Sequence, residues 1–268
     1  MKLNGISSNT PSNGHSSTDA QHDGRATNGV SHNGSSVDGH SVACDCLTDE
    51  LVDEIGDAHG TSSIDTPMRP DAFNLDDDFK IDLIEEHFRE IMNILGLDLT
   101  DDSLKGSPRR VAKMYVNEIF SGLNPANKPT PTLFDNKFRY KEMLVEKDII
   151  VQTYCEHHFV PIIGKSHVAY ISSGKVIGLS KLNRVVEYFS KRPQVQERLT
   201  IQIAEELKRV LETDDVAVII DAKHLCVSTR GVRDINSSTI TSSYGGKFEE
   251  EATRQEFLRY VAQPSITI

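Results

Sequence analysis

The order of strand-like and helix-like segments in the second half of the chain is the feature that most limits its fold. Two strand-like segments precede two consecutive amphipathic helices, and two more strand-like segments follow them. In order, these segments are 143–151, 167–171, 180–189, 195–211, 215–222 and 237–243. Strands and helices that are grouped in runs, rather than alternating one by one, are typical of an α+β fold. We therefore expect an α+β domain built on an antiparallel sheet.

A helical region is expected before this sheet. Apolar residues recur at steps of three and four from Ile81 to Leu95, and Gly96 ends the pattern, as in an amphipathic helix. Ser107 and Pro108 then provide the start signal of a second helix, as an N-cap and a first-turn proline. A last short helix is expected at about 252–261.

The first 70 residues are expected to form a disordered tail. They are rich in Ser, Asn, Gly, Asp and His, and large apolar residues are nearly absent before Leu47. Such a segment cannot bury enough apolar surface to offset the entropy lost on ordering. Cys44 and Cys46 lie in this segment and are interpreted as solvated thiols. The chain is therefore divided into a tail at 1–70, a helical region at 71–130 and a sheet domain at 131–268.

The charge distribution argues against a broad nucleic-acid surface. The net charge is −11, and the first 70 residues, with ten acidic and three basic side chains, account for −7 of it. The other 198 residues carry only −4, whereas a nucleic-acid surface needs a basic field. An anionic small molecule would therefore have to meet a local cluster of basic side chains.

The same sequence predicts a cytoplasmic protein without a membrane span. The longest apolar stretches, such as 216–220, are far shorter than the ~20 residues that a spanning helix requires. The first ten residues lack the apolar core of a secretory signal. Four cysteines in 268 residues do not make a disulfide framework, so reduced thiols are expected.

A metal site is suggested by the segment TYCEHHFVP at 153–161, which has a thiol, a carboxylate and two imidazoles in a row. Cys155 and His158 have the C-x-x-H spacing that lets one turn present two ligands to one ion. A further soft donor, Cys226, follows the apolar strand at 216–220. A Cys, His, Cys set suits Zn²⁺ in tetrahedral geometry and leaves the fourth position for water. The alternative interpretation is that no metal binds, because the two cysteines are buried and the histidine lies in a turn, far from one another.

Two further histidines are candidates for proton transfer. In an extended segment His224 and Cys226 point to the same face, so both can reach the site. The neighbours His157 and His158 point in different directions, and His158 is assigned to the metal. His157 and His224 are then left for acid–base chemistry, because a neutral imidazole titrates near the working pH. If either were instead a fourth ligand, the site would be closed and structural.

Several long motifs follow the tail in a fixed order. They are GSPRRVAKMYVNEIFSG at 106–122, then CEHHF, GLSKLNR, RPQVQERLT, HLC and TRG, and TRQEFLRYV at 253–261. This set resembles the zinc-dependent GTP cyclohydrolase I family over about residues 75–262. The resemblance implies a T-fold, in which a four-stranded antiparallel sheet carries two helices on one face and is preceded by a helical hairpin. It also implies a toroidal homodecamer of two pentamers, with active sites at subunit boundaries.

The resemblance further implies a reaction. Family members convert GTP and water into 7,8-dihydroneopterin triphosphate and formate, for folate or tetrahydrobiopterin biosynthesis. By this resemblance, Cys155, His158 and Cys226 would bind zinc, and activated water would attack C8 of the purine. His157 and His224 would be the acid–base pair, and the T-fold at 131–268 would be the catalytic domain.

The resemblance assigns Glu197 to the recognition of guanine, with Gln196 as a further base contact. A carboxylate can accept hydrogen bonds from guanine N1–H and the 2-amino group at once. Adenine offers neither donor there, which would leave the carboxylate unpaired. Taken alone, Glu197 is a solvated position on an amphipathic helix, as most glutamates are.

The triphosphate would be held by a local group of polar and basic side chains. The resemblance assigns this role to Ser180, Lys181, Arg184, Arg110 and Arg230. Ser180 is expected to cap its helix, whose first-turn N–H groups favour an anion. Arg184 would act across the subunit boundary. Arg109 and Arg233 are second choices, because adjacent arginines leave the alignment ambiguous by one place. Each such charge alone is more often a solvated surface residue.

Two other functions are weighed against this one. A zinc-stabilised module could hold a nucleotide without converting it, and other T-fold enzymes of pterin and deazapurine metabolism share the architecture. The spare imidazoles and the three-ligand site argue against the first. The CEHH, HLC and QERLT motifs argue against the second. If neighbouring subunits complete the pockets, an isolated monomer should be inactive.

Overall fold

The computed structural model describes residues 63–265. Most of the predicted tail, with Cys44 and Cys46, lies outside these described residues. Ser63 and Ile64, however, contact helix α5 (Gln196–Leu211). Their backbone carbonyls accept hydrogen bonds from Arg198 at 3.0 Å and Gln202 at 3.1 Å. The division of the chain at 70 and 130 remains a prediction.

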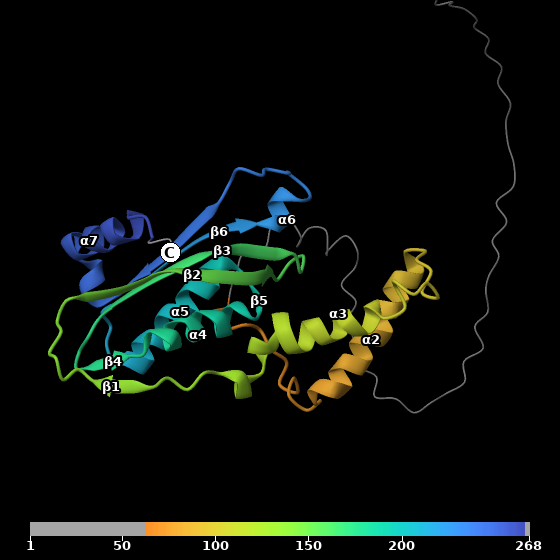
Figure 1. The fold of residues 1–268 in the computed structure, drawn as a ribbon, viewed down its shortest axis with the longest axis horizontal. Coiled ribbons are helices and arrows are strands. Elements are labelled where there is room, and N and C mark those ends of the chain that lie inside the picture. The colour runs from red at the N-terminus through yellow and green to blue at the C-terminus, as the bar shows by residue number, and fades with distance from the viewer. Residues whose placement is uncertain (1–62, 266–268) are drawn as a thin grey trace, which may run out of the picture. The chain divides into compact units, whose positions relative to one another are not determined.

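Two helices in the N-terminal part form the expected helical hairpin (Figure 1). They are α2 (Asp77–Ile94) and α3 (Ser107–Lys113), which continues as a π-helical turn over Met114–Ile119. Arg109 of α3 forms ion pairs with Asp82 and Glu85 of α2, which holds the two helices side by side. Gly96 follows α2 with a φ of 81°, as expected for a glycine that ends a helix.

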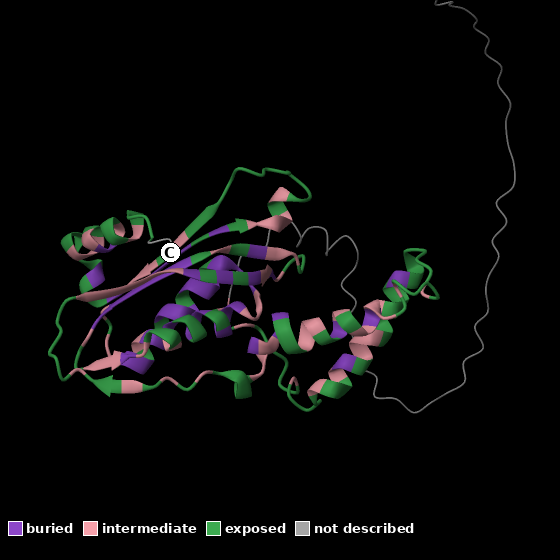
Figure 2. Cartoon of the chain, viewed as in Figure 1, coloured by how far each residue is buried: buried purple, intermediate pink, exposed green. Residues whose placement is uncertain are grey.

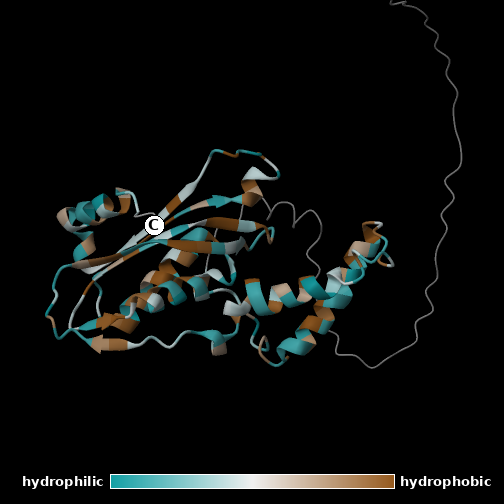
Figure 3. Ribbon diagram, viewed as in Figure 1, coloured by the Kyte–Doolittle hydropathy of each residue, from teal (hydrophilic) through white to brown (hydrophobic). Residues whose placement is uncertain are grey.

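The apolar stripe of α2 is only partly covered. Ile81 is buried, but Ile91 is 48% exposed and Leu95 is 70% exposed. Figure 3 shows hydrophobic residues along this helix. The periodicity therefore predicted the helix correctly, while the chain by itself does not bury its whole apolar face.

The predicted antiparallel sheet is confirmed. Its four main strands are β2 (Met143–Cys155), β3 (Pro161–Ile171), β6 (Val216–His224) and β7 (Thr239–Tyr244), which pair antiparallel in this order. The short β5 (Pro193–Gln194) adds a parallel pairing at the end of β2. A separate antiparallel pair, β1 (Leu133–Asp135) with β4 (Lys175–Ile177), was not predicted. Strands of three residues carry too little pattern to be recognised.

Two helices cover one face of this sheet, as the T-fold requires. They are α4 (Leu179–Ser190) and α5. Figure 2 shows the buried residues concentrated on these helices and on the central strands. Leu182, Val186, Leu199, Ile203 and Leu207 are fully buried and pack against the inward residues of the strands. No helix among residues 63–265 is long and apolar enough to cross a membrane.

The opposite face is partly covered by the C-terminal helix α7 (Glu251–Ala262), close to its predicted place. Phe248 and Phe257 are fully buried there against Ile171 and Ile219. The remaining area of this face carries exposed apolar side chains, including Ile240.

The helix starts differ from the predicted caps. Ser107 and Ser180 lie inside the first turns, and the N-cap positions are Gly106 and Gly178. Neither helix has a side-chain cap. A capping side chain must belong to the residue before the first helical one, so a serine within the turn cannot serve in this way.

Candidate metal centre and active site

A tight turn between β2 and β3 carries the first half of the predicted metal site. Cys155 is the last residue of β2. Its N–H donates to the carbonyl of Val160 at 2.9 Å, and its carbonyl accepts from Phe159 N–H at 2.8 Å. The ring of Phe159 packs edge-on against Phe120 at 5.3 Å. These contacts hold residues 156–158 at the end of the sheet.

The second half lies at the end of β6. His224 ends this strand, and Cys226 lies in the short helix α6 (Leu225–Ser228). The expected alternation of His224 and Cys226 on one face is therefore wrong, because the chain leaves the extended conformation at Leu225. The two halves still meet, because Ile162 of β3 pairs with His224.

Cys155, His158 and Cys226 converge on one point. Their ligand atoms all lie within 4.8 Å of one another, and among residues 63–265 no other group of three such side chains is found. Cys155 is buried and Cys226 half-buried. Two sulfurs and one imidazole nitrogen at these separations fit a tetrahedral zinc site after small side-chain shifts.

The protonation state of Cys226 depends on whether a cation is bound. Burial, followed by the nearby thiol of Cys155, raises the pKa of Cys226 to about 11. Without a cation, Cys226 is therefore a neutral thiol at pH 7. A bound divalent cation would have the opposite effect, because the thiolate is the form that binds metal.

The two proton-transfer candidates flank this group. His157 Nδ1 lies 3.6 Å from Cys155 Sγ, and its Nε2 lies 3.7 Å from a carboxylate oxygen of Glu156. Burial lowers the pKa of His224, and the charge of Glu197 partly opposes this effect. His224 is therefore mainly neutral at pH 7.

Gln196 fixes the orientation of His224. The Gln196 side chain is buried, and its Nε2 donates to the carbonyls of Ile220 at 3.0 Å and Thr239 at 2.8 Å. Its Oε1, 2.8 Å from His224 Nε2, must therefore accept a hydrogen bond from the imidazole N–H. This assigns the hydrogen to Nε2 and leaves Nδ1 as the free acceptor. The arrangement favours a role in orienting His224 over direct contact with a base.

Glu197 lies between two buried neighbours on the first turn of α5. Gln196 is 1% exposed and Arg198 is 4% exposed, whereas Glu197 points to solvent. Within residues 63–265, Glu197 has no ion-pair partner. Its charge partly opposes the lowering of the pKa of His224 by burial, so Glu197 acts on that imidazole through its charge while its own side chain is exposed.

The arginine candidates differ in position. Arg230 NH1 donates to His158 Nε2 at 2.8 Å, which brings its charge to the metal group. Arg110 is exposed on α3 and has no carboxylate partner within the described range. Arg109 is paired with Asp82 and Glu85, which favours Arg110 as the free charge of this adjacent pair.

Ser180, Lys181 and Arg184 lie on α4, away from the metal group of the same chain. This helix starts just after Ile177, whose N–H donates to the hydroxyl of Tyr170. Tyr170 is nine residues along β3 from Pro161, at the metal end, or roughly 30 Å. One chain therefore does not bring the start of α4 to its own metal group.

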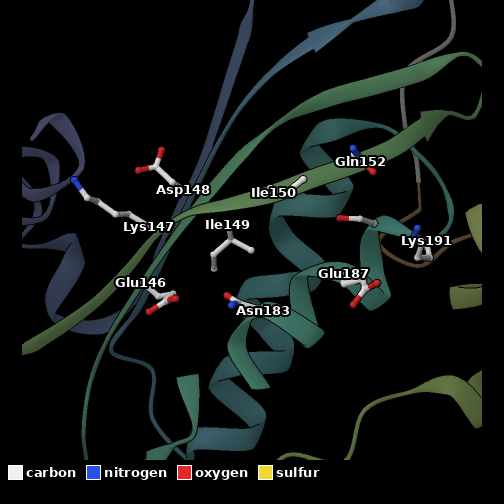
Figure 4. A pocket seen from close by; sticks show the side chains of 10 residues that line it. Glu146, Lys147, Asp148, Ile149, Ile150, Gln152, Asn183, Glu187 and Lys191 are labelled. Atoms are coloured by element: carbon white, nitrogen blue, oxygen red, sulfur yellow. The ribbon is translucent and has the colours of Figure 1, made fainter. Parts of the chain in front are cut away.

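The outer edge of β2 is open along most of its length. β5 pairs only with Tyr154 and Cys155, and within the described residues no strand pairs with the rest of this edge. A cavity of about 410 Å³ lies here, between residues 146–152 and α4 (Figure 4). It contains none of the predicted site residues.

The chain is similar in sequence to proteins of one known family. The sequence model described as GTP cyclohydrolase I matches residues 84–262. The chain belongs to the GTP cyclohydrolase I family. A GTP cyclohydrolase 1 from Flavobacterium johnsoniae is 60% identical over 213 residues, covering 80% of this chain and 96% of the relative. One from Salmonella arizonae is 53% identical over 208 residues, covering 77% and 94%.

The apo crystal structure of the archaeosine synthase QueF-Like is also matched, over 44% of this chain and 97% of that one. The TM-score is 0.32 and the identity 16%, and the family assignment does not depend on it.

The interaction between Arg198 and Glu156 at the site was not predicted from the sequence motifs. Arg198 and Glu156 form an ion pair beside the metal turn. In the sequence, Glu156 is simply a carboxylate within the predicted metal turn. The one local signal for Arg198 is its place next to Leu199 on the buried side of the helix.

Proposed function

We propose that this chain is a zinc-dependent GTP cyclohydrolase I, which opens the purine of GTP at C8 and forms 7,8-dihydroneopterin triphosphate and formate. This is the first step of pterin biosynthesis. Family membership supports the reaction. One structural observation supports the chemistry: Cys155, His158 and Cys226 converge, with His224 held beside them by α5.

Zinc would be held by Cys155, His158 and Cys226. When bound, it supplies Lewis-acid activation of water near neutral pH. Three protein ligands leave one position for solvent, as catalytic zinc sites require. A nucleotide-holding module would have no use for that open position or for the two additional imidazoles.

Proton transfer would be carried out by His224 and His157. Gln196 holds the Nε2–H of His224, so Nδ1 is the atom that can take a proton and return it. The lowered pKa of His224 keeps this atom free at neutral pH, which suits a general base. His157, beside Glu156, would act as its partner in protonating and opening the five-membered ring.

Glu197 would recognise guanine. Its carboxylate is exposed, next to Gln196 on the first turn of α5, and can accept from N1–H and the 2-amino group together. Gln196 would contribute by keeping His224 in place. The base would then lie beside the first turn of α5, with C8 toward the metal.

The triphosphate would be bound between two chains. Arg230 and Arg110 are exposed cations that could bind phosphate groups of the substrate from the chain that carries the metal group. Ser180, Lys181 and Arg184 lie too far from the metal group of their own chain, so a neighbouring chain would supply them. Among residues 63–265, no strand pairs with the outer edge of β7 or with most of the outer edge of β2, and this supports such an assembly, because unpaired edges can join sheets of adjacent subunits. A decamer of two pentamers agrees with this arrangement.

One assay tests the proposal directly. The full chain loaded with zinc is incubated with GTP, and formate release and pterin fluorescence are measured together with metal content. We expect both products in equal amounts, with zinc bound near one equivalent per chain. GTP binding without formate release would support the nucleotide-holding module and overturn the proposal.

A further inference from the structure

The first turn of α5 contacts both segments that carry the metal ligands. It begins with Gln196, Glu197 and Arg198. Gln196 binds His224, at the end of β6. Arg198 binds Glu156, in the turn after β2. The exposed Glu197 lies between these two contacts along the chain.

Every nitrogen of the Arg198 guanidinium has an acceptor. NH1 and NH2 donate to the two carboxylate oxygens of Glu156, the latter at 3.3 Å, and Nε donates to the carbonyl of Ser63 at 3.0 Å. The Arg198 side chain is only 3% exposed and the Glu156 side chain 21%. A forked pair of this kind fixes the orientation of the carboxylate as well as its distance.

Glu156 is fixed at its backbone as well. Its N–H donates to the carbonyl of Gln194 at 3.0 Å. It directly follows Cys155, and one of its oxygens lies 3.7 Å from His157 Nε2. A shift of the Glu156 backbone would therefore also shift its chain neighbours Cys155 and His157, one a candidate metal ligand and the other a candidate for proton transfer.

We propose that Arg198 is a positioning residue for the metal turn. It holds Glu156 so that Cys155 and His158 keep the separation that a metal needs and His157 keeps its orientation. Ser63 belongs to this support, because its carbonyl is the third acceptor of the same guanidinium. The folded catalytic unit then begins at or before Ser63, inside the predicted tail. The inference rests on the proposed function only for the identity of the metal and the reaction.

The same helix offers a matched control. Arg209 also forms a forked pair, with Glu206, at 3.1 Å from Nε and 2.7 Å from NH2. It lies at the other end of α5, far along the helix from the metal turn, and its side chain is 63% exposed. Arg198→Lys and Arg209→Lys therefore make the same chemical change on one helix, with and without a connection to the metal turn. Lysine keeps the charge but cannot form the fork.

The experiment uses the full-length zinc-loaded protein and three readouts. Zinc affinity is measured by competition with a chromogenic chelator, backbone order by hydrogen exchange at residues 155–159 and 63–66, and turnover as kcat and KM for GTP. We expect Arg198→Lys to weaken zinc binding and lower kcat, each by about 10–100-fold, as for other residues that support metal ligands. Exchange should accelerate in both segments, while KM changes little. Arg209→Lys should match the wild type in all three.

The result that overturns the proposal is an Arg198→Lys protein that matches Arg209→Lys in chelator competition and in exchange at 155–159. If Arg198→Lys does not fold by circular dichroism, Glu156→Gln decides, because it keeps the side-chain size but removes the charge and one of the two oxygens that accept from Arg198. Weaker zinc binding in that variant supports the proposal, and unchanged binding overturns it. If the wild type binds metal but does not convert GTP, the proposed function fails, whereas the chelator and exchange readouts still test the role of Arg198.

Discussion

Helices α4 and α5 lie on the same face of the sheet, yet their first turns have different environments. The first turn of α5 is enclosed: Gln196 and Arg198 are buried and bonded to the segments on either side of the metal group. The first turn of α4 is open, with Leu179 50% exposed and Ser180 exposed as well.

This difference indicates what one chain can assemble alone. The first turn of α5 is supported by contacts within the chain, so the metal group and Glu197 are arranged without a partner. The first turn of α4 has no side-chain cap among the described residues and carries Lys181, at the opposite end of the sheet from the metal group. Such a helix start can bind an anion, and in the proposed assembly that anion would be the triphosphate of a GTP bound at the metal group of another chain.

Removing a metal ligand should have the largest effect. Cys226→Ser replaces a soft thiolate by a weak hydroxyl ligand, so we expect loss of bound zinc and a fall in turnover of about 10³-fold or more. Metal analysis and formate release measure both quantities on the same sample. Cys46→Ser, in the predicted tail, serves as the control and should keep zinc and activity. Full turnover in Cys226→Ser without bound metal would remove this residue from the site.

Removing the charge of Glu197 should have the next largest effect. In Glu197→Gln the amide offers only one acceptor oxygen to the two donors of guanine, and the charge-assisted pair is lost. We expect kcat/KM for GTP to fall about 100-fold, equivalent to roughly 3 kcal/mol, with zinc content unchanged. Glu205→Gln, an exposed glutamate on the same helix, should leave kcat/KM unaltered. Equal behaviour of the two variants would show that Glu197 does not read the base.

The sequence allowed most of the sheet and helix order to be predicted, because apolar periodicity is a local property. It also pointed to Cys155, His158 and Cys226, which converge in the structure, because C-x-x-H spacing and the family motifs are local patterns. The reasoning for Cys226 failed in one step: alternation holds only in an extended strand, and the chain turns helical at Leu225. The convergence depends instead on the register that pairs Ile162 with His224.

The supporting contacts of the site could not be predicted in this way. Arg198 and Glu156 are 42 positions apart, and nothing near either residue identifies its partner. The same holds for the bond between Gln196 and His224, which requires α5 and β6 to be placed first. Such pairs are set by tertiary packing, so motifs locate the chemistry while the contacts that orient it become visible only in the folded chain.

Mixed oligomers test whether one active site combines the first turn of α5 from one chain with the first turn of α4 from another chain. His224→Ala damages the metal side and Lys181→Ala damages the α4 side. When both variants are co-expressed, about a quarter of the sites in random assemblies combine two intact sides. We therefore expect about a quarter of wild-type GTP turnover, well above either variant alone. Co-expression of His224→Ala with Glu197→Gln, both on the metal side, should restore nothing. No gain in the first mixture would mean that each chain forms its own site.

The smallest effect should come from adding the same cap to both helices. Gly178→Ser places a hydroxyl at the N-cap of α4, where a new Cβ meets only Lys181 Cγ at 3.9 Å, and should stabilise the protein by a few tenths of a kcal/mol. Val195→Ser adds the same hydroxyl at the N-cap of α5 but removes a side chain that is 9% exposed. The lost burial should outweigh the cap and destabilise the protein by about 1–2 kcal/mol. Urea unfolding of the two variants measures both signs. Destabilisation of equal size at both positions would show that the first turn of α4 is as tightly packed as that of α5, and the contrast between them would then lie in their hydrogen bonds alone.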